Sequence, residues 1–255
     1  MKPHLSPRLY VEADLRSGLA VTAGPEQAHY LRHVMRLKEG DAVRLFNGRD
    51  GEWLGEITAE ATKKPSKHAG GARIVLLKPL RVQGAPSDLW LCAAPIKKAH
   101  FDYMVEKATE LGVGAIRPIL TARTQVRDAN IERLRAIAVE AAEQSERLDV
   151  PAIHEPAKLE NLLVQWPADQ RLIVCAEWGE AMPAYEAFAR LDGAPGEKAA
   201  ILVGPEGGLA AEELDLLRQV PQGLFIRLGP RILRADTAAI AALSVWQAVK
   251  GDWSC

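Results

Sequence analysis

The chain has 255 residues, of which 48% are apolar and 25% charged, and its formal net charge is −1, a composition that is ordinary for a globular protein and argues against intrinsic disorder. No uncharged apolar run approaches the roughly 20 residues that span a bilayer, and the opening segment Met1–Arg8 lacks the apolar core of a signal peptide. Cys92, Cys175 and Cys255 are scattered without metal-ligand spacing, so we expect a reduced, cytoplasmic protein with no membrane association.

The first eighty residues predict a small, mostly β unit. A short helix is expected over Pro25–Met35, with Pro25 in its first turn. Its apolar face consists of three residues, Leu31, Val34 and Met35. A hairpin is expected around the turn residues 47–51, with a further strand over Ile74–Leu77.

This leading segment is also the basic part of the chain. It contains thirteen Lys and Arg against nine Asp and Glu, whereas the remaining residues carry an acidic excess. Such an asymmetry suits a module that binds a polyanion beside a near-neutral catalytic module. Chance variation in a short segment would explain the asymmetry equally well, so charge alone does not decide the partner.

After a predicted linker over residues 81–88, short apolar runs alternate with helical periodicity. The apolar runs predict buried strands at Leu89–Ile96, Ala115–Leu120, Leu172–Ala176, Ala199–Val203 and Leu224–Leu228. The helices are expected near Phe101–Leu111, over Asn130–Glu146, Ala210–Gln219 and Asp236–Lys250, the last of them buried. This alternation is typical of the α/β class, with a mainly parallel sheet covered by helices.

Two glycine-rich segments follow the last two predicted strands. They are residues 204–209, with the sequence GPEGGL, and residues 228–234, with the sequence LGPRILR. Glycine at a strand-to-helix turn permits positive φ and lets a ligand approach backbone amides. Two such turns therefore predict a small-molecule cleft at the carboxyl ends of neighbouring strands. Neither turn matches the dinucleotide-binding fingerprint or the P-loop.

These turns resemble the signature of the SPOUT methyltransferases, and in particular of the RsmE family of 16S ribosomal RNA uridine-N3 methyltransferases. Other stretches that resemble this family follow in the same order along residues 7–246, namely His29–Lys38, Gly40-Asp41, Lys107–Val113 and Glu143–Ser145. One departure is Asp236, which stands where the family pattern has glutamate.

The resemblance implies two domains. Residues 1–80 would form a PUA-like RNA-binding β-barrel domain, and residues 81–255 a SPOUT methyltransferase domain with a deep trefoil knot. It also implies S-adenosyl-L-methionine as cofactor, 16S ribosomal RNA within the small ribosomal subunit as partner, and a homodimer with sites near the subunit interface.

Under this interpretation, backbone groups of the two turns bind S-adenosylmethionine while Leu228, Ile232 and Leu233 flank its adenine. The predicted cofactor-binding residues are Val203, Gly204, Gly207, Gly208, Leu228, Gly229, Arg231, Ile232 and Leu233. The alternative for each glycine is that it only permits a tight turn.

Methylation at uridine N3 requires that the imide proton leave and that negative charge spread over the flanking carbonyl oxygens. Arg234, which lies three residues after Arg231, is predicted to stabilise this anion. No histidine, cysteine or serine presents itself as the base, so Glu206 and Asp236 are the remaining candidates. Asp236 is better explained as the cap of the last helix.

Basic residues of the first domain are predicted to contact RNA: Arg8, Arg32, His33, Arg36, Lys63 and Lys64. His29 and His33 share a helix face, but no third ligand accompanies them, so we expect no metal site.

Two alternative functions remain open. One is another SPOUT methyltransferase that acts on transfer RNA or on a ribose 2′-hydroxyl. The other is a non-catalytic RNA-binding or ribosome-assembly protein, which calorimetry would distinguish because it would not bind S-adenosylmethionine.

Overall fold

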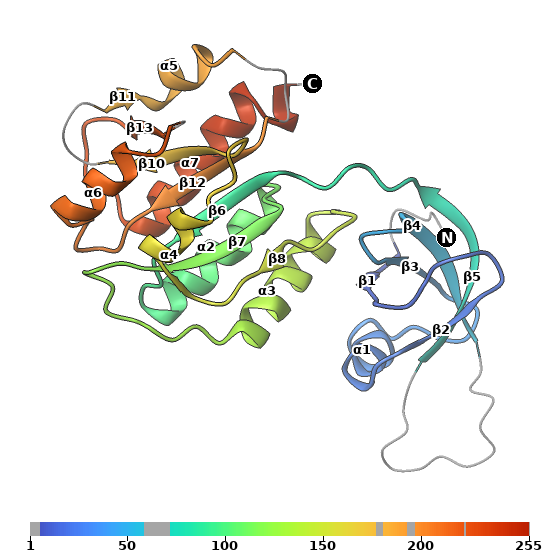
Figure 1. Cartoon of the computed structure of the whole chain (residues 1–255). Helices are drawn as coiled ribbons and strands as arrows, with labels where there is room; N and C mark the ends of the chain where they lie inside the picture. Colours follow the sequence, from blue (N-terminus) through green and yellow to red (C-terminus); the bar gives the residue numbers. More distant parts are fainter. Residues whose placement is uncertain (1–5, 59–71, 177–180, 193–196, 222, 255) are drawn as a thin grey trace. The chain divides into compact units, whose positions relative to one another are not determined.

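The computed structural model describes residues 6–58, 72–176, 181–192, 197–221 and 223–254. The contacts within the chain divide it into two compact units (Figure 1). The first unit contains residues 1–85 and 142–149, and the second contains residues 86–141 and 150–255. One helix, α3 (Ile131–Gln144), is shared between them, since its last three residues belong to the first unit.

The first unit contains a five-stranded sheet that curls into a half-barrel. Its strands are β1 (Arg8–Tyr10), β2 (Ala20–Ala23), β3 (Ala42–Phe46), β4 (Glu52–Thr58) and β5 (Ala72–Arg81), in the order β1-β3-β4-β5-β2. β1 runs parallel to β3, and the other pairs are antiparallel. Buried apolar side chains from these strands form the core of the unit, so the predicted β domain is confirmed.

The predicted hairpin joins β3 to β4. The side-chain oxygen of Asn47 accepts hydrogen bonds from the amides of Arg49 and Asp50, at 3.0 and 2.8 Å, which fixes the turn. Gly51 ends the turn with φ 77°, and a Cβ there would lie 2.2 Å from the carbonyl oxygen of Arg81. No other residue fits that position without a backbone shift.

The predicted helix over residues 25–35 is only partly correct. It begins as α1 (Pro25–His29) and continues as a π-helical turn, η2 (Tyr30–Val34), in which the Met35 amide bonds to the Tyr30 carbonyl. A π-turn has a wider repeat than the 3.6-residue period, so the expected apolar face is lost. Leu31 is buried, but Val34 and Met35 are 60% and 40% exposed.

The second unit is built on a parallel sheet. Its strands are β6 (Leu89–Ala93), β7 (Ala115–Leu120), β8 (Ala152–Ile153), β9 (Ala157–Lys158), β10 (Arg171–Cys175), β11 (Met182–Pro183), β12 (Ala199–Val203) and β13 (Gly223–Arg227). Their order is β11-β13-β10-β12-β6-β7-β8, with β9 also paired to β7. The predicted mainly parallel sheet is therefore confirmed.

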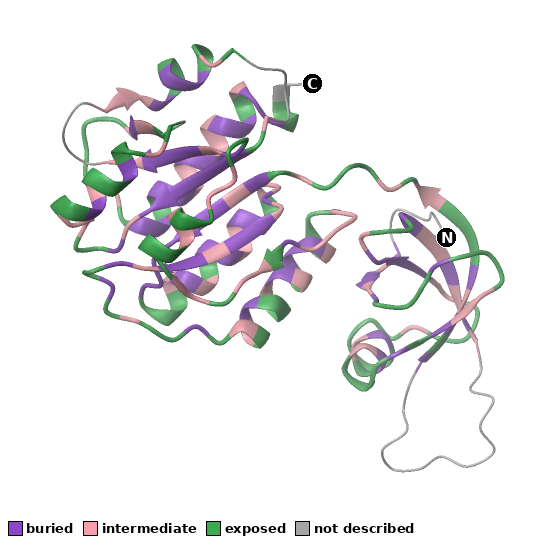
Figure 2. Ribbon diagram, viewed as in Figure 1, coloured by how far each residue is buried: buried purple, intermediate pink, exposed green. Residues whose placement is uncertain are grey.

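Helices cover both faces of this sheet. They are α2 (Lys98–Glu110), α3, α4 (Leu159–Val164), α5 (Ala184–Ala189), α6 (Ala211–Arg218) and α7 (Ala235–Val249), followed by the short helix η3 (Asp252–Ser254). Ile201 and Val203 of β12 pack with α2, α3, α5 and α7, whereas Ala200 and Leu202 pack with α4 and α6. Alternate residues of β12 thus enter two separate cores, which explains why this central strand is apolar throughout and buried in Figure 2.

α7 is mostly buried, as predicted, since only Thr237 and Ala248 among its residues are exposed. Trp246 is 1% exposed and stacks edge-on against Phe188 of α5, with ring centroids 5.1 Å apart.

Gly112 follows α2 with φ 84°, the left-handed conformation that ends many helices. Cys92 is a core residue, and burial raises the pKa of its thiol to about 12. No helix among the described residues has the length and apolar character to cross a membrane.

Candidate functional site

Both glycine-rich turns lie at the carboxyl edge of the parallel sheet, since one follows β12 and the other follows β13. These two strands are not neighbours, because β10 pairs with both of them and lies between them. The expectation of adjacent strands is therefore wrong. The common strand direction still brings both turns to one edge, where ligands bind in open parallel sheets.

The first turn is held from the loop after β7. Gly208 has φ 72°, and its amide bonds to the Pro205 carbonyl at 2.8 Å. The Arg123 guanidinium donates a hydrogen bond to the Gly207 carbonyl, also at 2.8 Å. A Cβ at Gly204 would lie 3.1 Å from Cγ of Leu209. These contacts hold the backbone of the turn in one conformation. The role of Arg123 in holding it was not predicted from the sequence.

A buried carboxylate fixes the start of the following helix. Glu213 is 4% exposed, and its two oxygens accept hydrogen bonds from the amides of Ala122 and Ala210, at 2.7 and 2.8 Å. Ala210 is the residue before α6, so Glu213 ties that helix end to the loop after β7. The place of Glu213 three residues after Ala210, as in a capping box, is the sequence signal that could have identified the contact with Ala210.

The second turn combines open backbone with exposed apolar surface. Gly229 has φ 83°, and a Cβ placed on it would meet no atom within 4 Å. Ile232 is 67% exposed, while Leu228 and Leu233 are half-buried against the core. A flat ring can approach such a glycine and lie against these aliphatic side chains, so the residues present fit the adenine of S-adenosylmethionine. Arg231 is exposed beside them.

The predicted capping role of Asp236 needs correction. Arg234 occupies the N-cap position of α7, with φ −64° and ψ 156°, and its exposed side chain makes no cap hydrogen bond. Asp236 lies within the first turn, where one carboxylate oxygen accepts the Thr237 amide at 2.8 Å. The carboxylate therefore stabilises the helix start from inside the helix.

The other oxygen of Asp236 lies 2.8 Å from Nδ1 of His100, in the first turn of α2. Burial raises the pKa of the Asp236 carboxyl, but hydrogen bonds from His100 and Thr237 lower it more, so this pKa lies below its ordinary value. Sequence reasoning missed His100, although its place just after β6 puts it at the same carboxyl edge. Glu206, the other predicted base, is exposed in the first turn.

The residues of the first unit that were predicted to contact RNA differ in where the structure places them. Arg32, His33 and Arg36 are exposed around η2, and Arg36 has a left-handed backbone with φ 56°. Lys63 and Lys64 lie outside the described residues. The His29 and His33 rings are 4.7 Å apart, and no group of three metal-ligating side chains occurs within the described ranges.

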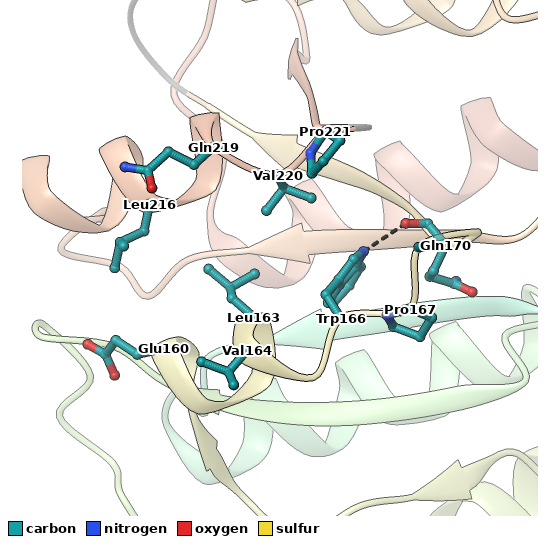
Figure 3. Close-up of a pocket in the computed structure, with 11 residues that line it drawn as sticks. Glu160, Leu163, Val164, Trp166, Pro167, Gln170, Leu216, Gln219, Val220 and Pro221 are labelled. Atoms are coloured by element: carbon teal, nitrogen blue, oxygen red, sulfur yellow. Dashed lines mark hydrogen bonds between the residues drawn. The ribbon is translucent and has the colours of Figure 1, made fainter.

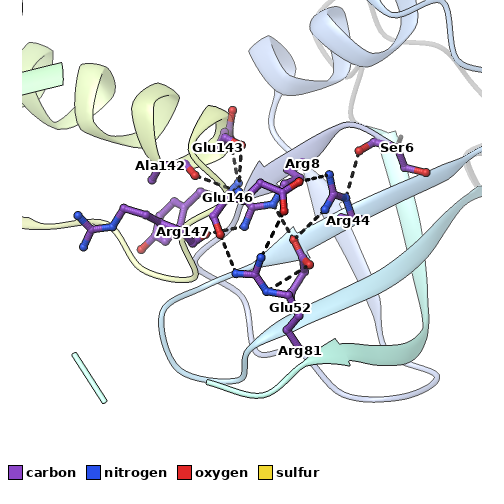
Figure 4. Close-up of polar contacts among 10 residues, drawn as sticks. Ser6, Arg8, Arg44, Glu52, Arg81, Ala142, Glu143, Glu146 and Arg147 are labelled. Atoms are coloured by element: carbon purple, nitrogen blue, oxygen red, sulfur yellow. Dashed lines mark hydrogen bonds and ion pairs between the residues drawn. The ribbon is translucent and has the colours of Figure 1, made fainter. Parts of the chain in front are cut away.

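Arg8 does not face solvent, which contradicts its predicted role as a phosphate contact (Figure 4). It is 5% exposed, and its Nε lies 2.6 Å from a carboxylate oxygen of Glu52, which is also buried. The guanidinium also donates to the backbone carbonyls of Ala142, Glu143 and Arg147. These contacts engage four of the five guanidinium N–H donors inside the protein, so Arg8 is a structural residue.

A separate groove of about 520 Å³ lies at the opposite edge of the sheet (Figure 3). Its apolar lining includes Leu163, Trp166, Pro167, Leu216, Val220 and Pro221. The lining residues precede β10 and β13, whereas the glycine-rich turns follow β12 and β13. The groove is therefore distinct from the predicted cofactor site.

The first turn can be tested by a Gly204→Val substitution. We expect the Kd for S-adenosylmethionine to rise at least tenfold, since the new side chain would displace Leu209 and narrow the backbone approach. Calorimetry measures the Kd, and thermal unfolding checks that the variant is folded. A folded variant with unchanged affinity would remove this turn from the cofactor site.

Comparison with known proteins extends over most of the chain. Residues 83–247 match a family model described as an RNA methyltransferase domain, and residues 23–66 match an RNA methyltransferase PUA domain. The chain is 34% identical over 239 residues to the ribosomal RNA small subunit methyltransferase E of Rickettsia conorii, with 93% of each protein covered. Its identity to the Bacillus subtilis protein of the same name is 30% over 227 residues, covering 86% of each.

A crystal structure of ribosomal RNA small subunit methyltransferase E from Neisseria gonorrhoeae, bound to S-adenosyl methionine, has the same fold. The TM-score is 0.84 at 26% identity, over 97% of this chain and 99% of that chain. These findings confirm the predicted α/β fold, the PUA-like first domain and the predicted family, while the trefoil knot stays a prediction. The chain belongs to the RNA methyltransferase family that includes the ribosomal RNA small subunit methyltransferases E.

Proposed function

We propose that this chain transfers a methyl group from S-adenosylmethionine to N3 of one uridine in 16S ribosomal RNA. The observation that carries the proposal is the pair of glycine-rich turns at one edge of the parallel sheet, in a chain of this family. The relatives' names support the ribosomal substrate, and the cofactor in the Neisseria structure supports the methyl donor.

The two domains take separate tasks in this proposal. Residues 1–80 bind RNA, with Arg32, His33, Arg36, Lys63 and Lys64 as phosphate contacts. Residues 81–255 hold the cofactor and contain the knot. The enzyme acts in the cytoplasm as a homodimer, on RNA assembled into the small subunit.

The cofactor would be held by backbone groups of residues 203–208 and 228–233, and it supplies an electrophilic methyl group. Arg234 is the last residue of the second turn, with an exposed side chain. We propose that its guanidinium stabilises the negative charge that develops on the uracil carbonyl oxygens as N3 loses its proton. The protein contributes further by placing N3 in line with the methyl group, since positioning is a large part of such catalysis.

Primer extension tests the product directly. N3-methylation replaces the only hydrogen-bond donor on the Watson–Crick edge of uracil, so reverse transcriptase should stop at the modified base. The protein and S-adenosylmethionine are incubated with small ribosomal subunits from a strain that lacks this gene. We expect one new, strong stop at a single uridine, which is absent when the methyl donor is left out.

The alternatives give different results. A ribose 2′-O-methyl leaves the pairing edge free and causes only a pause that depends on nucleotide concentration. Methyl incorporation into transfer RNA, with an unchanged profile along ribosomal RNA, would refute the ribosomal substrate. A protein that binds no S-adenosylmethionine, with or without RNA, would be the non-catalytic alternative.

A further inference from the structure

A histidine–aspartate pair joins the starts of two helices at the carboxyl edge of the sheet. His100 lies in the first turn of α2, which follows β6, and Asp236 lies in the first turn of α7, which follows β13. Nδ1 of His100 is 2.8 Å from Oδ2 of Asp236. Asp236 is two residues beyond Arg234, so the pair lies beside the second glycine-rich turn.

The two members of the pair differ in exposure. The Asp236 side chain is 11% exposed, and its second oxygen is engaged by the Thr237 amide. The His100 side chain is 37% exposed, and its Nε2 makes no hydrogen bond within the described part of the chain. One end of the imidazole is thus anchored in the protein, and the other is accessible from solvent.

This anchoring fixes the tautomer of a neutral imidazole. An ionised carboxylate only accepts hydrogen bonds, so Nδ1 must carry the hydrogen that points to Asp236. Nε2 of the neutral ring then has a free lone pair. The low pKa of Asp236 agrees with an ionised carboxylate at neutral pH. This arrangement of base and orienting carboxylate is the one that histidine bases use in catalysis.

We propose that His100 is the general base of the reaction and that Asp236 is its positioning residue. This assignment rests on the proposed function, because it requires a substrate that loses a proton at the site. Nε2 of His100 takes the N3 proton of uridine, and the bonding pair of the N3–H bond stays on N3. N3 then bonds to the methyl carbon of the donor, while the carbon–sulfur bonding pair remains on sulfur.

The charges balance in this step. The sulfonium loses its positive charge, and His100 gains one as an imidazolium next to the Asp236 carboxylate. The imidazolium afterwards releases its proton to solvent. Lys97 and Lys98 at the start of α2 and Arg234 at the start of α7 are the neighbouring cations in sequence, while Asp102 of α2 is paired with Arg133 of α3. Asp236 therefore provides the carboxylate that stabilises the imidazolium.

The pair also connects α2 to α7, so a test must separate catalysis from folding. A His100→Gln variant keeps a side-chain donor for Asp236 but has no basic nitrogen. We expect it to unfold at the wild-type temperature and to bind S-adenosylmethionine normally, with kcat lowered about 10²–10⁴-fold. His100→Ala should lose a similar factor, and added imidazole should restore part of its activity in proportion to the imidazole concentration.

Two further variants test the positioning role of Asp236 and provide a control. Asp236→Asn should also lower kcat, because its amide can hold His100 in the wrong tautomer, and imidazole should not restore it. His154→Ala is the matched control, since His154 is the other histidine of the second unit and lies after β8. It should have the wild-type kcat and no response to imidazole.

The primer-extension stop made by the wild-type protein is measured first, in the same assay. Without that stop the proposed function fails, whatever the variants do. If the wild type gives the stop and His100→Gln gives it at the same rate, only the base assignment is overturned. A folded His100→Ala variant whose lost activity does not respond to imidazole would also overturn it. A Glu206→Gln variant that alone abolishes turnover would assign the base to Glu206.

Discussion

Replacing Arg234 with alanine is expected to lower kcat for RNA methylation by about 10²–10³-fold, the usual effect of removing one donor that stabilises a developing oxyanion. The Kd for S-adenosylmethionine should stay within about twofold, because the backbone groups of the turn are unchanged. The fold should also persist, since the Arg234 side chain is exposed and makes no cap hydrogen bond for α7.

Single-turnover kinetics with saturating cofactor measures this effect, and calorimetry gives the cofactor affinity. Arg227→Ala provides a matched control, because Arg227 is an exposed arginine at the end of β13 to which we assign no catalytic role. A wild-type rate for Arg234→Ala would remove Arg234 from the catalytic residues. A weakened Kd with normal kcat would instead assign it to cofactor binding.

The second large effect is on stability. We expect Arg8→Met to lower the free energy of unfolding of the first unit by about 3 kcal/mol, because it leaves the buried Glu52 without its closest cation. The loss lies at the lower end of the usual range for a broken buried pair, since Arg44 and Arg81 remain at 3.6 and 3.8 Å from Glu52. The substitution also removes the hydrogen bonds that Arg8 donates to the backbone carbonyls of residues 142, 143 and 147.

Urea unfolding, followed by the fluorescence of Trp53, measures this loss. Arg49→Met is the control, because the Arg49–Asp14 pair is exposed on both sides and such pairs contribute at most about 1 kcal/mol. A stable Arg8→Met protein with weakened RNA binding would restore the role as a phosphate contact that the sequence had indicated.

The elements of the second unit were predictable because their signals are local. An apolar run between turn residues specifies a buried strand whatever it packs against, and β7 and β12 have the predicted bounds. The π-turn after α1 was not predictable in this way. Its 3.6-residue pattern indicates a regular helix, and only the structure shows Met35 bonding to Tyr30 instead.

In the candidate site, too, some features follow from the local sequence and others only from tertiary contacts. Its glycine turns could be found from the sequence because positive φ restricts the residue type at Gly208 and Gly229. Arg123 contacts the first turn, and His100 contacts Asp236, from other parts of the chain, so their roles depend on tertiary contacts. Arg8 shows the converse, since an arginine in a basic leading domain indicates an RNA contact until its buried partner Glu52 is known.

The division of α3 between the two units has a consequence for synthesis on the ribosome. The carbonyls that receive the Arg8 guanidinium belong to residues 142–147, far along the chain from the strand that carries it. A nascent chain that has reached only residue 85 contains all five strands of the half-barrel but lacks these acceptors. The amino-terminal unit therefore cannot reach its native state first and alone, as leading domains generally do. Its completion must wait until much of the second unit has been translated.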